Sequence, residues 1–330
     1  MADVFRPSTA KGGQIMDRVI DHPVTSTIRK RVWEEIENMG TTLDKPLTSH
    51  PLREIVVAVE MNLLQIARLI NNGEINPYSE IRTCEGDLPK KTGAMPLRIG
   101  FYPVAANPFH WAHLIIGLMA TARFMLDKVI YIIAGSDPRK PELLPAGIRH
   151  TMGKEVLKMF APLFGYSPIA IGNMADGETN TFKILGLNPD QEITAFYIAG
   201  GDHYHRINPK TNRPDTIQKL EHGIANSLYD FNGRAHSISA VFIDRGTRER
   251  RVQTSLGVYF VPPLQFEASS TIIRQAFQGE CENEHLAILP YAAYRFVTTF
   301  GLYDSNVPSQ KESRIPGLTK AYAHAVGYQN

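Results

Sequence analysis

The most constraining feature of this 330-residue chain is an alternation, from Leu97 onward, of short apolar runs with helical patterns. The runs are too uniformly apolar for a sheet with one solvated face, which indicates parallel strands covered on both sides. We expect these strands at LRIGFY, KVIYIIAG, IAIG, ITAFYIAG, ISAVFID and VYFV. Helical stretches occur at residues 113–126, 148–160, 216–224 and 271–278. The alternation predicts an α/β fold: a doubly wound, Rossmann-like parallel sheet with helices on both faces.

The first part of the chain has a helical character instead. Ser26 and Thr27 are placed to cap RKRVWEEIENMG, and Ser49 precedes a longer periodic stretch that stops at Gly73. The chain from 76 to 95 contains Pro, Gly and charged residues without periodicity, as is typical of a linker. We therefore predict a helical N-terminal extension (1–95) for packing or oligomerisation, an α/β domain (96–303) and a polar C-terminal tail (304–330).

Composition narrows the function classes. The 35 Lys and Arg residues against 33 Asp and Glu residues give a net charge of +2, which lacks the strong positive field that long duplex nucleic acid calls for. The two cysteines, Cys84 and Cys281, make neither a disulfide framework nor a four-thiolate zinc site and favour a reducing compartment. The chain shows no apolar stretch of about 18 residues, so we expect no membrane association and a cytoplasmic location.

The loop after the first predicted strand carries two histidines. Ligands of doubly wound folds bind beyond the carboxyl ends of the strands, so this loop, PVAANPFHWAHLIIG, is a place to look for chemistry. His110 and His113 are three residues apart at the start of a helix, so both imidazoles can share one face near its positive end. Such a pair suits a phosphate, because a histidine is either a neutral donor or a cation near neutral pH. Two histidines that only fill a helix N-terminus, or half a metal site, are the alternatives.

A second element with phosphate-binding chemistry follows the strand VYFVPP. In QFEASSTIIRQAF, the hydroxyls of Ser269, Ser270 and Thr271 and the free backbone N–H groups of a helix N-terminus converge on one point. Arg274 lies one turn further along the same side. An ordinary helix cap followed by a solvent-facing arginine is the alternative for this segment.

Together these two elements resemble the nucleotidyltransferases with HxGH and SSTxIR motifs, in particular the nicotinate/nicotinamide mononucleotide adenylyltransferases. NPFHWAH and SSTIIR occur in the right order at opposite ends of one predicted domain. YIAGGD resembles the family's strand that ends in G-x-D, and RKPELLPAGIRHTM resembles a segment with a basic residue followed by R-x-x-M. LPYAAYRFVTTFGLY, which ends at Tyr303, is similar to the closing helix of the bacterial enzymes. The resemblance covers roughly residues 97 to 303, which makes 96–303 a nucleotidyltransferase domain.

The resemblance implies adenylyl transfer. A nucleotide phosphate attacks the α-phosphorus of ATP, pyrophosphate leaves, and a NAD-type dinucleotide forms, with Mg²⁺ bound mainly through the ATP phosphates. The partners are then ATP and a small phosphorylated acceptor, and a homo-oligomer is compatible with the helical extension. The implied catalytic residues are His110, His113, Lys140 and Arg274. The residues implied for ATP and phosphate binding are Ala105, Asn107, Gly200, Asp202, Ser269, Ser270 and Thr271.

The chain departs from the family pattern at three places, and the third of them, a missing tryptophan, leaves the acceptor open. Pro103 and Val104 stand where the family has small residues, and Ala112 replaces the glycine of HxGH. The bacterial enzymes place a tryptophan after G-x-D to stack on the pyridine ring, whereas this chain has only Trp33 and Trp111. By match, acceptor binding would therefore fall to Tyr204 and Arg149.

Two further readings are kept beside the adenylyltransferase. The first keeps the reaction but changes the acceptor to phosphopantetheine, glycerol phosphate or a sugar phosphate. The second is a non-catalytic nucleotide-binding protein. His203 and His205 beside Asp202 also form a D-H-x-H cluster, which we attribute to nucleotide binding rather than to a metal. No protein metal site is expected.

Overall fold

The computed structural model describes residues 21–88, 96–137, 140, 142–226, 230–231, 234–244 and 253–303. The predicted tail 304–330, the first 20 residues of the extension and residues 89–95 of the linker lie outside these ranges. The strands are β1 (Leu97–Val104), β2 (Lys128–Ile133), β3 (Phe164–Ser167), β4 (Ile193–Gly200), β5 (Ile207–Asn208), β6 (Arg213–Pro214), β7 (Asp230–Phe231), β8 (Arg234–Ala235), β9 (Ser237–Ile243) and β10 (Gly257–Val261). The α-helices are α1 (Pro23–Thr42), α2 (Leu52–Asn71), α3 (Trp111–Phe124), α4 (Ala146–Leu157), α5 (Gly177–Gly186), α6 (Gly201–His205), α7 (Asp215–Ala225), α8 (Ser270–Phe277) and α9 (Tyr291–Thr299). Two 3₁₀ helices are Lys158–Phe160 and Asn283–Ile288.

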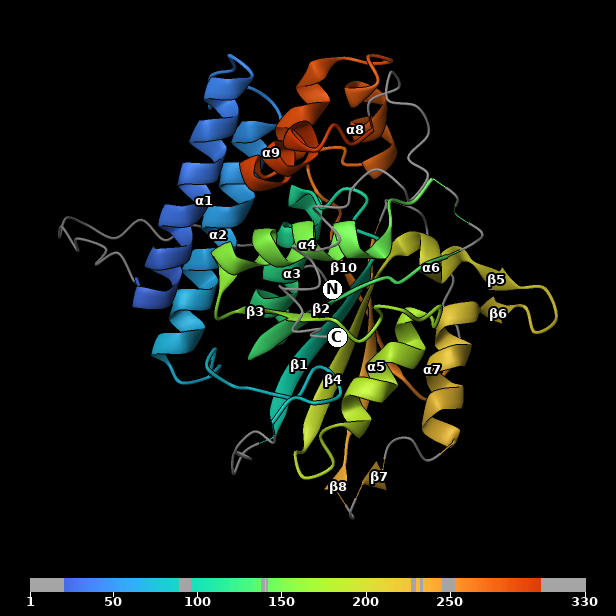
Figure 1. The fold of residues 1–330 in the computed structure, drawn as a ribbon. Helices are drawn as coiled ribbons and strands as arrows, with labels where there is room; N and C mark the ends of the chain where they lie inside the picture. Colours follow the sequence, from blue (N-terminus) through green and yellow to red (C-terminus); the bar gives the residue numbers. More distant parts are fainter. Residues whose placement is uncertain are drawn as a thin grey trace, which may run out of the picture.

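A six-stranded sheet in the order β10-β9-β4-β1-β2-β3 forms the centre of the molecule (Figure 1). Every pairing within it is parallel, for example Phe101 of β1 with Ile130 of β2 and Tyr197 of β4. The strand order reverses between β1 and β4, because the chain winds outward from β1 in both directions. In open sheets of this kind, ligands bind at such a switch point, beyond the carboxyl ends of the strands. The predicted fold class is confirmed.

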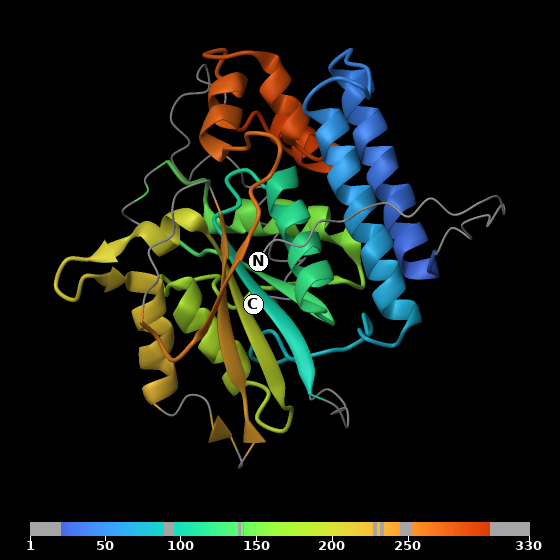
Figure 2. The same ribbon diagram turned by 180° about the vertical axis from the view of Figure 1, so that it is seen from behind.

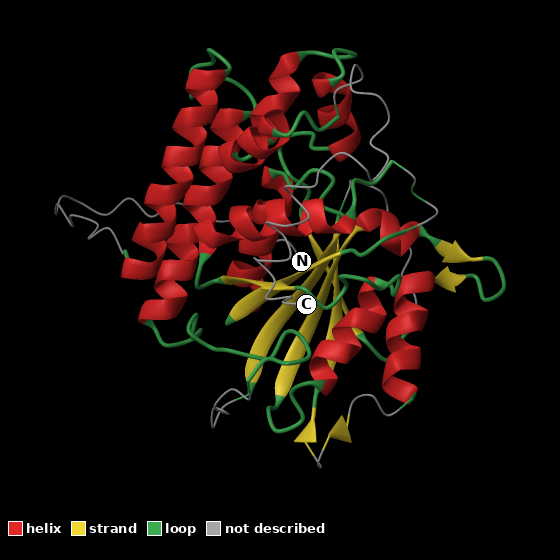
Figure 3. Cartoon of the chain, viewed as in Figure 1, coloured by secondary structure: helices red, strands yellow, loops and turns green. Residues whose placement is uncertain are grey.

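Alternate side chains along the strands divide the core into two clusters, one on each face of the sheet. Tyr102 and Val104 of β1 point to the cluster that also contains apolar residues of α1–α4, α8 and α9. Ile99 and Phe101 point to the other cluster, which is formed with α5 and α7. Figure 3 shows helices covering both faces. This period of two along each strand explains why the strands are apolar throughout.

The N-terminal helices α1 and α2 form an outer layer over α3 and α9 (Figure 2). Buried residues at helical spacing on α1 (Ile28, Val32 and Ile36) and on α2 (Leu63 and Ile66) join the same cluster as α3. The extension therefore shares its hydrophobic core with the α/β domain. No helix in the described part of the chain has the length and apolar character needed to cross a membrane.

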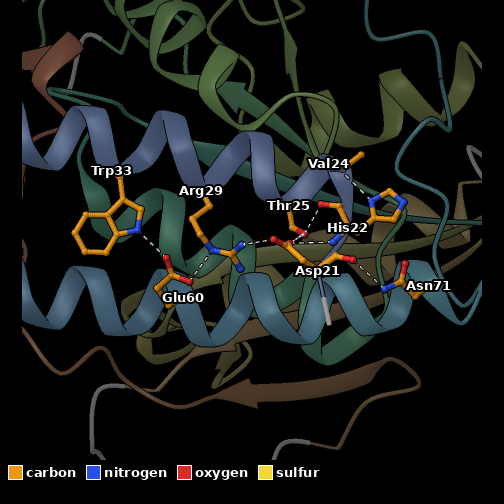
Figure 4. A network of polar contacts seen from close by, with 8 residues as sticks. All are labelled: Asp21, His22, Val24, Thr25, Arg29, Trp33, Glu60 and Asn71. Atoms are coloured by element: carbon orange, nitrogen blue, oxygen red, sulfur yellow. Dashed lines mark hydrogen bonds and ion pairs between the residues drawn. The ribbon is translucent and has the colours of Figure 1, made fainter. Parts of the chain in front are cut away.

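Polar contacts also fasten α1 to α2, as Figure 4 shows. The Glu60 carboxylate of α2 accepts hydrogen bonds from Nε of Arg29 and from the indole N–H of Trp33, each at 2.8 Å. Arg29 also donates to Asp21 at 2.9 Å. One of the two tryptophans of the chain is thereby engaged between these outer helices.

Several predicted boundaries were wrong. His22, rather than Ser26 or Thr27, caps α1, and Pro51 precedes α2 without a side-chain cap, so Ser49 is not a cap either. IAIG lies in a turn after β3 and is not a strand. Within the predicted linker, residues 76–88 are irregular but bonded to the domain: the Arg82 N–H donates to Asn188 at 2.8 Å.

Candidate active site

A cavity of about 1010 Å³ opens beyond the carboxyl ends of β1, β4 and β9. Its described lining comes from five parts of the chain: the end of β1 with the start of α3, the β4–α6 junction, the end of β9, the segment before α8, and the first turn of α8. The lining residues that the sequence predicted are Ala105, His110, His113, Gly200, Asp202, Ser269, Ser270 and Thr271. The structure thus brings together two motifs that are about 160 residues apart in the sequence.

The two histidines stack at the N-terminus of α3, with ring centroids 3.8 Å apart. The backbone N–H of His110 donates to Nδ1 of His113 at 3.3 Å, so the neutral His113 imidazole carries its proton on Nε2. Burial lowers the pKa of His113 to about 4 and the pKa of His110 well below its ordinary value. Both imidazoles are therefore neutral at pH 7, and Nε2–H of His113 is a neutral donor near the cavity.

The neighbouring aromatic side chains set the orientation of His113. Tyr131 of β2 donates its hydroxyl to the His113 carbonyl at 2.9 Å, and Phe109 packs against the imidazole with ring centroids 5.1 Å apart. Tyr102, which also lines the cavity, lies 6.3 Å from His113 between ring centroids. The imidazole is thus held by contacts on several sides.

The first turn of α8 faces the histidines across the cavity. Ser269 caps the helix by accepting a hydrogen bond from the Thr271 N–H at 3.2 Å. Ser270 donates to the Pro108 carbonyl at 3.3 Å and so links the two motifs directly. Arg274 donates to the Asn107 carbonyl at 2.9 Å and to the Thr271 hydroxyl at 3.3 Å. Ser269, Ser270 and Thr271 line the cavity, whereas Arg274 lies behind them, bonded to Asn107 and Thr271, and is not among the described lining residues.

Asn107 joins three segments through its buried side chain. Its Oδ1 accepts hydrogen bonds from the Leu144 N–H at 3.1 Å and from the Tyr303 hydroxyl at 2.9 Å, and its Nδ2 donates to the Glu142 carbonyl at 3.2 Å. Asn107 was predicted to bind phosphate, but these contacts engage its amide group with the protein. Its side chain positions the loop.

Two residues predicted to bind the acceptor do not line this cavity. Arg149 is fully buried and donates to backbone carbonyls of the loops around the site. Tyr204 is 3% exposed and packs against Phe242 and Phe260. In the structure both side chains contact other parts of the protein, and neither is among the described residues that line the cavity.

Lys140 is exposed and lies on the loop between β2 and α4. It is near enough to His203 to be among the groups that lower the pKa of that imidazole, of which burial is the largest and Arg206 another. Lys140 therefore stands on the Asp202 side of the site, although it is not among the lining residues.

Pro103 and Val104 lie within a strand and not in the loop that follows it. Both belong to the end of β1, where they pair in register with Ile132 and Ile133 of β2. The pairing of β1 with β4 ends earlier, at Phe101, so Pro103 lies beyond it. The loop itself begins at Ala105.

Sequence reasoning missed two acidic residues of the lining, Asp244 and Glu267. Asp244 directly follows β9, and that position at the end of a predicted strand was the available signal. With Asp202 they give the described lining three carboxylates and no Lys or Arg. Among the described residues no group of three or more His, Cys, Asp or Glu side chains is arranged to hold a metal ion.

The sheet order, the histidine pair at the N-terminus of α3 and the hydroxyl-rich first turn of α8 define a doubly wound α/β protein whose two predicted motifs meet at one cavity. The comparisons then narrow the class, because the chain is similar to nicotinate-nucleotide adenylyltransferases. The probable nicotinate-nucleotide adenylyltransferase of Clostridium acetobutylicum is 28% identical over 202 residues, which cover 60% of this chain and 94% of that protein. The protein of the same name from Thermoanaerobacter sp. is 25% identical over 213 residues, or 63% of this chain and 94% of that protein. The resemblance seen in the motifs is confirmed.

A solved structure is also similar to this chain, at lower sequence identity. The nicotinic acid mononucleotide adenylyltransferase of Plasmodium falciparum, solved in complex with NaAD, aligns with a TM-score of 0.48 and 14% identity over 64% of this chain and 100% of that chain. No protein-family model matches the chain.

Proposed function

We propose that this protein transfers the AMP part of ATP to the phosphate of nicotinate mononucleotide, with release of pyrophosphate. The observation that carries the proposal is the meeting of the His110–His113 pair and the α8 N-terminus at one cavity. The similarity to nicotinate-nucleotide adenylyltransferases, over nearly the whole length of those relatives, supports the same reaction.

The reaction needs no nucleophile from the protein. An acceptor phosphate oxygen forms a bond to the α-phosphorus of ATP, and the bond between this phosphorus and the bridging oxygen breaks as pyrophosphate leaves. The protein contributes alignment of the two phosphates and stabilisation of the charge that develops between them. His113 donates from Nε2–H to a non-bridging oxygen, and the first turn of α8 with Arg274 holds the leaving phosphates.

Mg²⁺ fits this site as a companion of ATP rather than as an ion held by the protein alone. The described lining offers carboxylates at Asp202, Asp244 and Glu267, but among the described residues no group of three possible ligands is arranged to hold a metal ion. Bound to the triphosphate, the ion would neutralise charge on the phosphate oxygens. Asp202 would act at the ATP ribose or at the metal-phosphate region, while Lys140 would assist from the facing loop.

The acceptor is the part of the proposal with least support from the cavity. Neither tryptophan lies at it, since Trp33 bonds to Glu60 between α1 and α2 and Trp111 is fully buried. Pyridine stacking would therefore fall to another ring, and the described lining offers the aromatic side chains of Tyr102 and Phe266. This observation keeps a different phosphorylated acceptor as the second candidate.

The test is Mg²⁺-dependent release of pyrophosphate from ATP, with nicotinate and nicotinamide mononucleotides supplied separately. We expect release with the nicotinate compound and detection of the dinucleotide product. If neither compound supports release while phosphopantetheine or a sugar phosphate does, the second candidate replaces the first. If no acceptor supports release, the adenylyltransferase proposal fails.

The site itself is tested by His113→Ala, which removes the neutral donor. Removal of one preorganised donor to developing charge typically lowers kcat by about 10²- to 10³-fold, so we expect kcat to fall by at least about 100-fold. His222→Ala is the matched control, because His222 is exposed on α7, on the other face of the sheet. An active His113→Ala enzyme would remove the basis for the assignment.

A further inference from the structure

Arg149 occupies an unusual position for an arginine. It lies in the first turn of α4, has 0% of its surface exposed, and donates four hydrogen bonds. Nε donates to the Leu144 carbonyl at 2.8 Å, Nη1 to the carbonyls of Ala105 at 2.7 Å and Ala134 at 2.8 Å, and Nη2 to the Gly135 carbonyl at 2.7 Å. These bonds use most of the five N–H donors of a guanidinium.

The four carbonyls belong to two loops, the one between β1 and α3 and the one between β2 and α4. Ala105 follows β1, Ala134 and Gly135 follow β2, and Leu144 precedes α4. One planar group therefore ties together the carboxyl ends of two adjacent strands. In a trans peptide the C=O and the N–H of the next residue point in opposite directions. Because the Ala105 carbonyl points toward Arg149, the Ala106 N–H points away from Arg149. Ala105 itself lines the cavity.

The loop after β1 contains one residue with an unfavourable backbone conformation. Ala106 adopts φ +53°, a left-handed conformation that costs a non-glycine residue about 1 kcal/mol or more. Such conformations persist where the surroundings determine them on several sides. Here Arg149 holds the carbonyl of Ala105 on one side, while Arg274 and Tyr303 hold Asn107 on the other.

The charge of Arg149 is not neutralised locally. Its hydrogen-bond acceptors are neutral carbonyls, and among the described residues no carboxylate forms an ion pair with it. Burial lowers its pKa to about 10, so the guanidinium is still a cation at pH 7. The described cavity lining, in contrast, carries carboxylates and no Lys or Arg. A buried positive charge behind Ala105 acts through a medium of low dielectric constant.

We propose that Arg149 is a positioning residue that fixes the phosphate-facing loop after β1 and supplies a permanent positive charge behind it. The inference rests on the proposed function in assigning ATP to this cavity. Arg149 does not contact the nucleotide; it acts through the backbone of Ala105 and its neighbours. The guanidinium shape sets the loop, and the cation offsets the carboxylates that face the triphosphate.

Two substitutions separate shape from charge. Arg149→Met removes both, whereas Arg149→Lys keeps a cation but loses the planar fork. The measurement is calorimetric binding of Mg·ATP without acceptor, after circular dichroism and a melting curve have established that each variant is folded. We expect Arg149→Met to raise the dissociation constant about tenfold or more, and Arg149→Lys to raise it less. With acceptor, Arg149→Lys should lower kcat more than it raises KM for ATP, because the loop is misaligned while the charge remains.

Arg98→Met is the matched control. Arg98 is a half-buried arginine at the opposite end of β1, and it donates from Nε and Nη2 to the Phe124 carbonyl at 3.0 and 2.7 Å. We expect this variant to melt earlier than the wild type while its affinity for Mg·ATP stays within about twofold. This outcome would show that loss of an arginine–carbonyl contact does not in itself weaken nucleotide binding.

Tyr303→Phe keeps the inference testable if Arg149→Met does not fold. The variant loses only the hydroxyl that donates to Asn107, and we expect a threefold to tenfold weaker affinity for Mg·ATP, as for one lost hydrogen bond. If Arg149→Met is folded and binds Mg·ATP with wild-type affinity, the proposal is refuted. If Arg149→Met is unfolded, the proposal is refuted when both Arg149→Lys and Tyr303→Phe keep wild-type affinity and kcat. Because ATP binding is measured without acceptor, an inactive but ATP-binding wild type would refute the proposed function and leave this inference standing.

Discussion

His150 should make the folded protein sensitive to acid. It follows Arg149 on α4, is 1% exposed, and its Nδ1 lies 2.8 Å from the Tyr166 hydroxyl. Burial, with a smaller contribution from Arg149, lowers the pKa of His150 to about 4. Since the unfolded chain binds a proton near pH 6.5, the unfolded state takes up more protons than the folded state between pH 6.5 and 4. Stability is retained above this window and is lost as the pH falls through it.

The size of the effect follows from the two pKa values. With about 4 in the folded state and about 6.5 in the unfolded state, lowering the pH from 7 to 5 costs about 2 kcal/mol of unfolding free energy from this residue alone. The substitution His150→Gln removes the titrating group and keeps a polar side chain. Urea unfolding at pH 7 and pH 5 gives the measurement, and the difference between the two pH values should be smaller in the variant by about 2 kcal/mol.

A control separates burial from the hydrogen bond. Tyr166→Phe removes the hydroxyl near Nδ1 but leaves the imidazole buried, so this variant should lose as much stability in acid as the wild type. Part of the acid sensitivity should survive in His150→Gln, because burial also lowers the pKa of His113 to about 4. Equal acid losses in His150→Gln and the wild type would refute the reasoning.

Three other substitutions test the packing around the site. Gly117→Ala would place a methyl group on the Tyr131 hydroxyl, so we expect a loss of about 1–3 kcal/mol in urea unfolding and a lower kcat, because Tyr131 bonds to the His113 carbonyl. Glu35→Ala removes the carboxylate that accepts the Ala292 N–H of α9 at 2.7 Å, and a melting curve should show a loss of about 1–3 kcal/mol. Leu63→Ala, at a fully buried position of α2, should cost about 2–5 kcal/mol if the extension shares the domain core, and an unchanged melting temperature would contradict that.

Much of the fold was predictable because its strands bury both faces. Five of the six expected strands coincide with observed ones, since each is a continuous apolar run. The sixth failed because β3 is the edge strand FGYS, which is only half buried and has no such run. Helix α5 (GETNTFKILG) was missed, because it begins and ends in glycine and is rich in polar residues. Local patterns carry little signal where burial is partial.

In the candidate site, too, some residues could be predicted from local sequence and others could not. Histidines and hydroxyls at helix N-termini were predictable, because their chemistry depends on local spacing that the sequence shows directly. The role of Arg149 was not, because its four acceptors are carbonyls of residues between 5 and 44 positions away in the chain. A sequence does not show where backbone carbonyls point. The carbonyls that accept from Arg149 come together only when β1 and β2 pair in the folded protein. An arginine that serves the backbone and one that binds substrate look the same until then.

A series of contacts connects the helical extension to the loop that carries the histidines. Glu35 of α1 caps the first turn of α9, the chain after α9 leads to Tyr303, and Tyr303 donates to Asn107 beside the histidine loop. Burial raises the pKa of Glu35, so the carboxylate is held by its backbone donors against an unfavourable environment. The first and last of these links are hydrogen bonds and the middle one is the chain itself, and apolar residues of α1 and α9 belong to one core cluster. We therefore expect removal of the extension to abolish the Glu35 contact to α9 and, through α9, to loosen the position of Tyr303 beside Asn107.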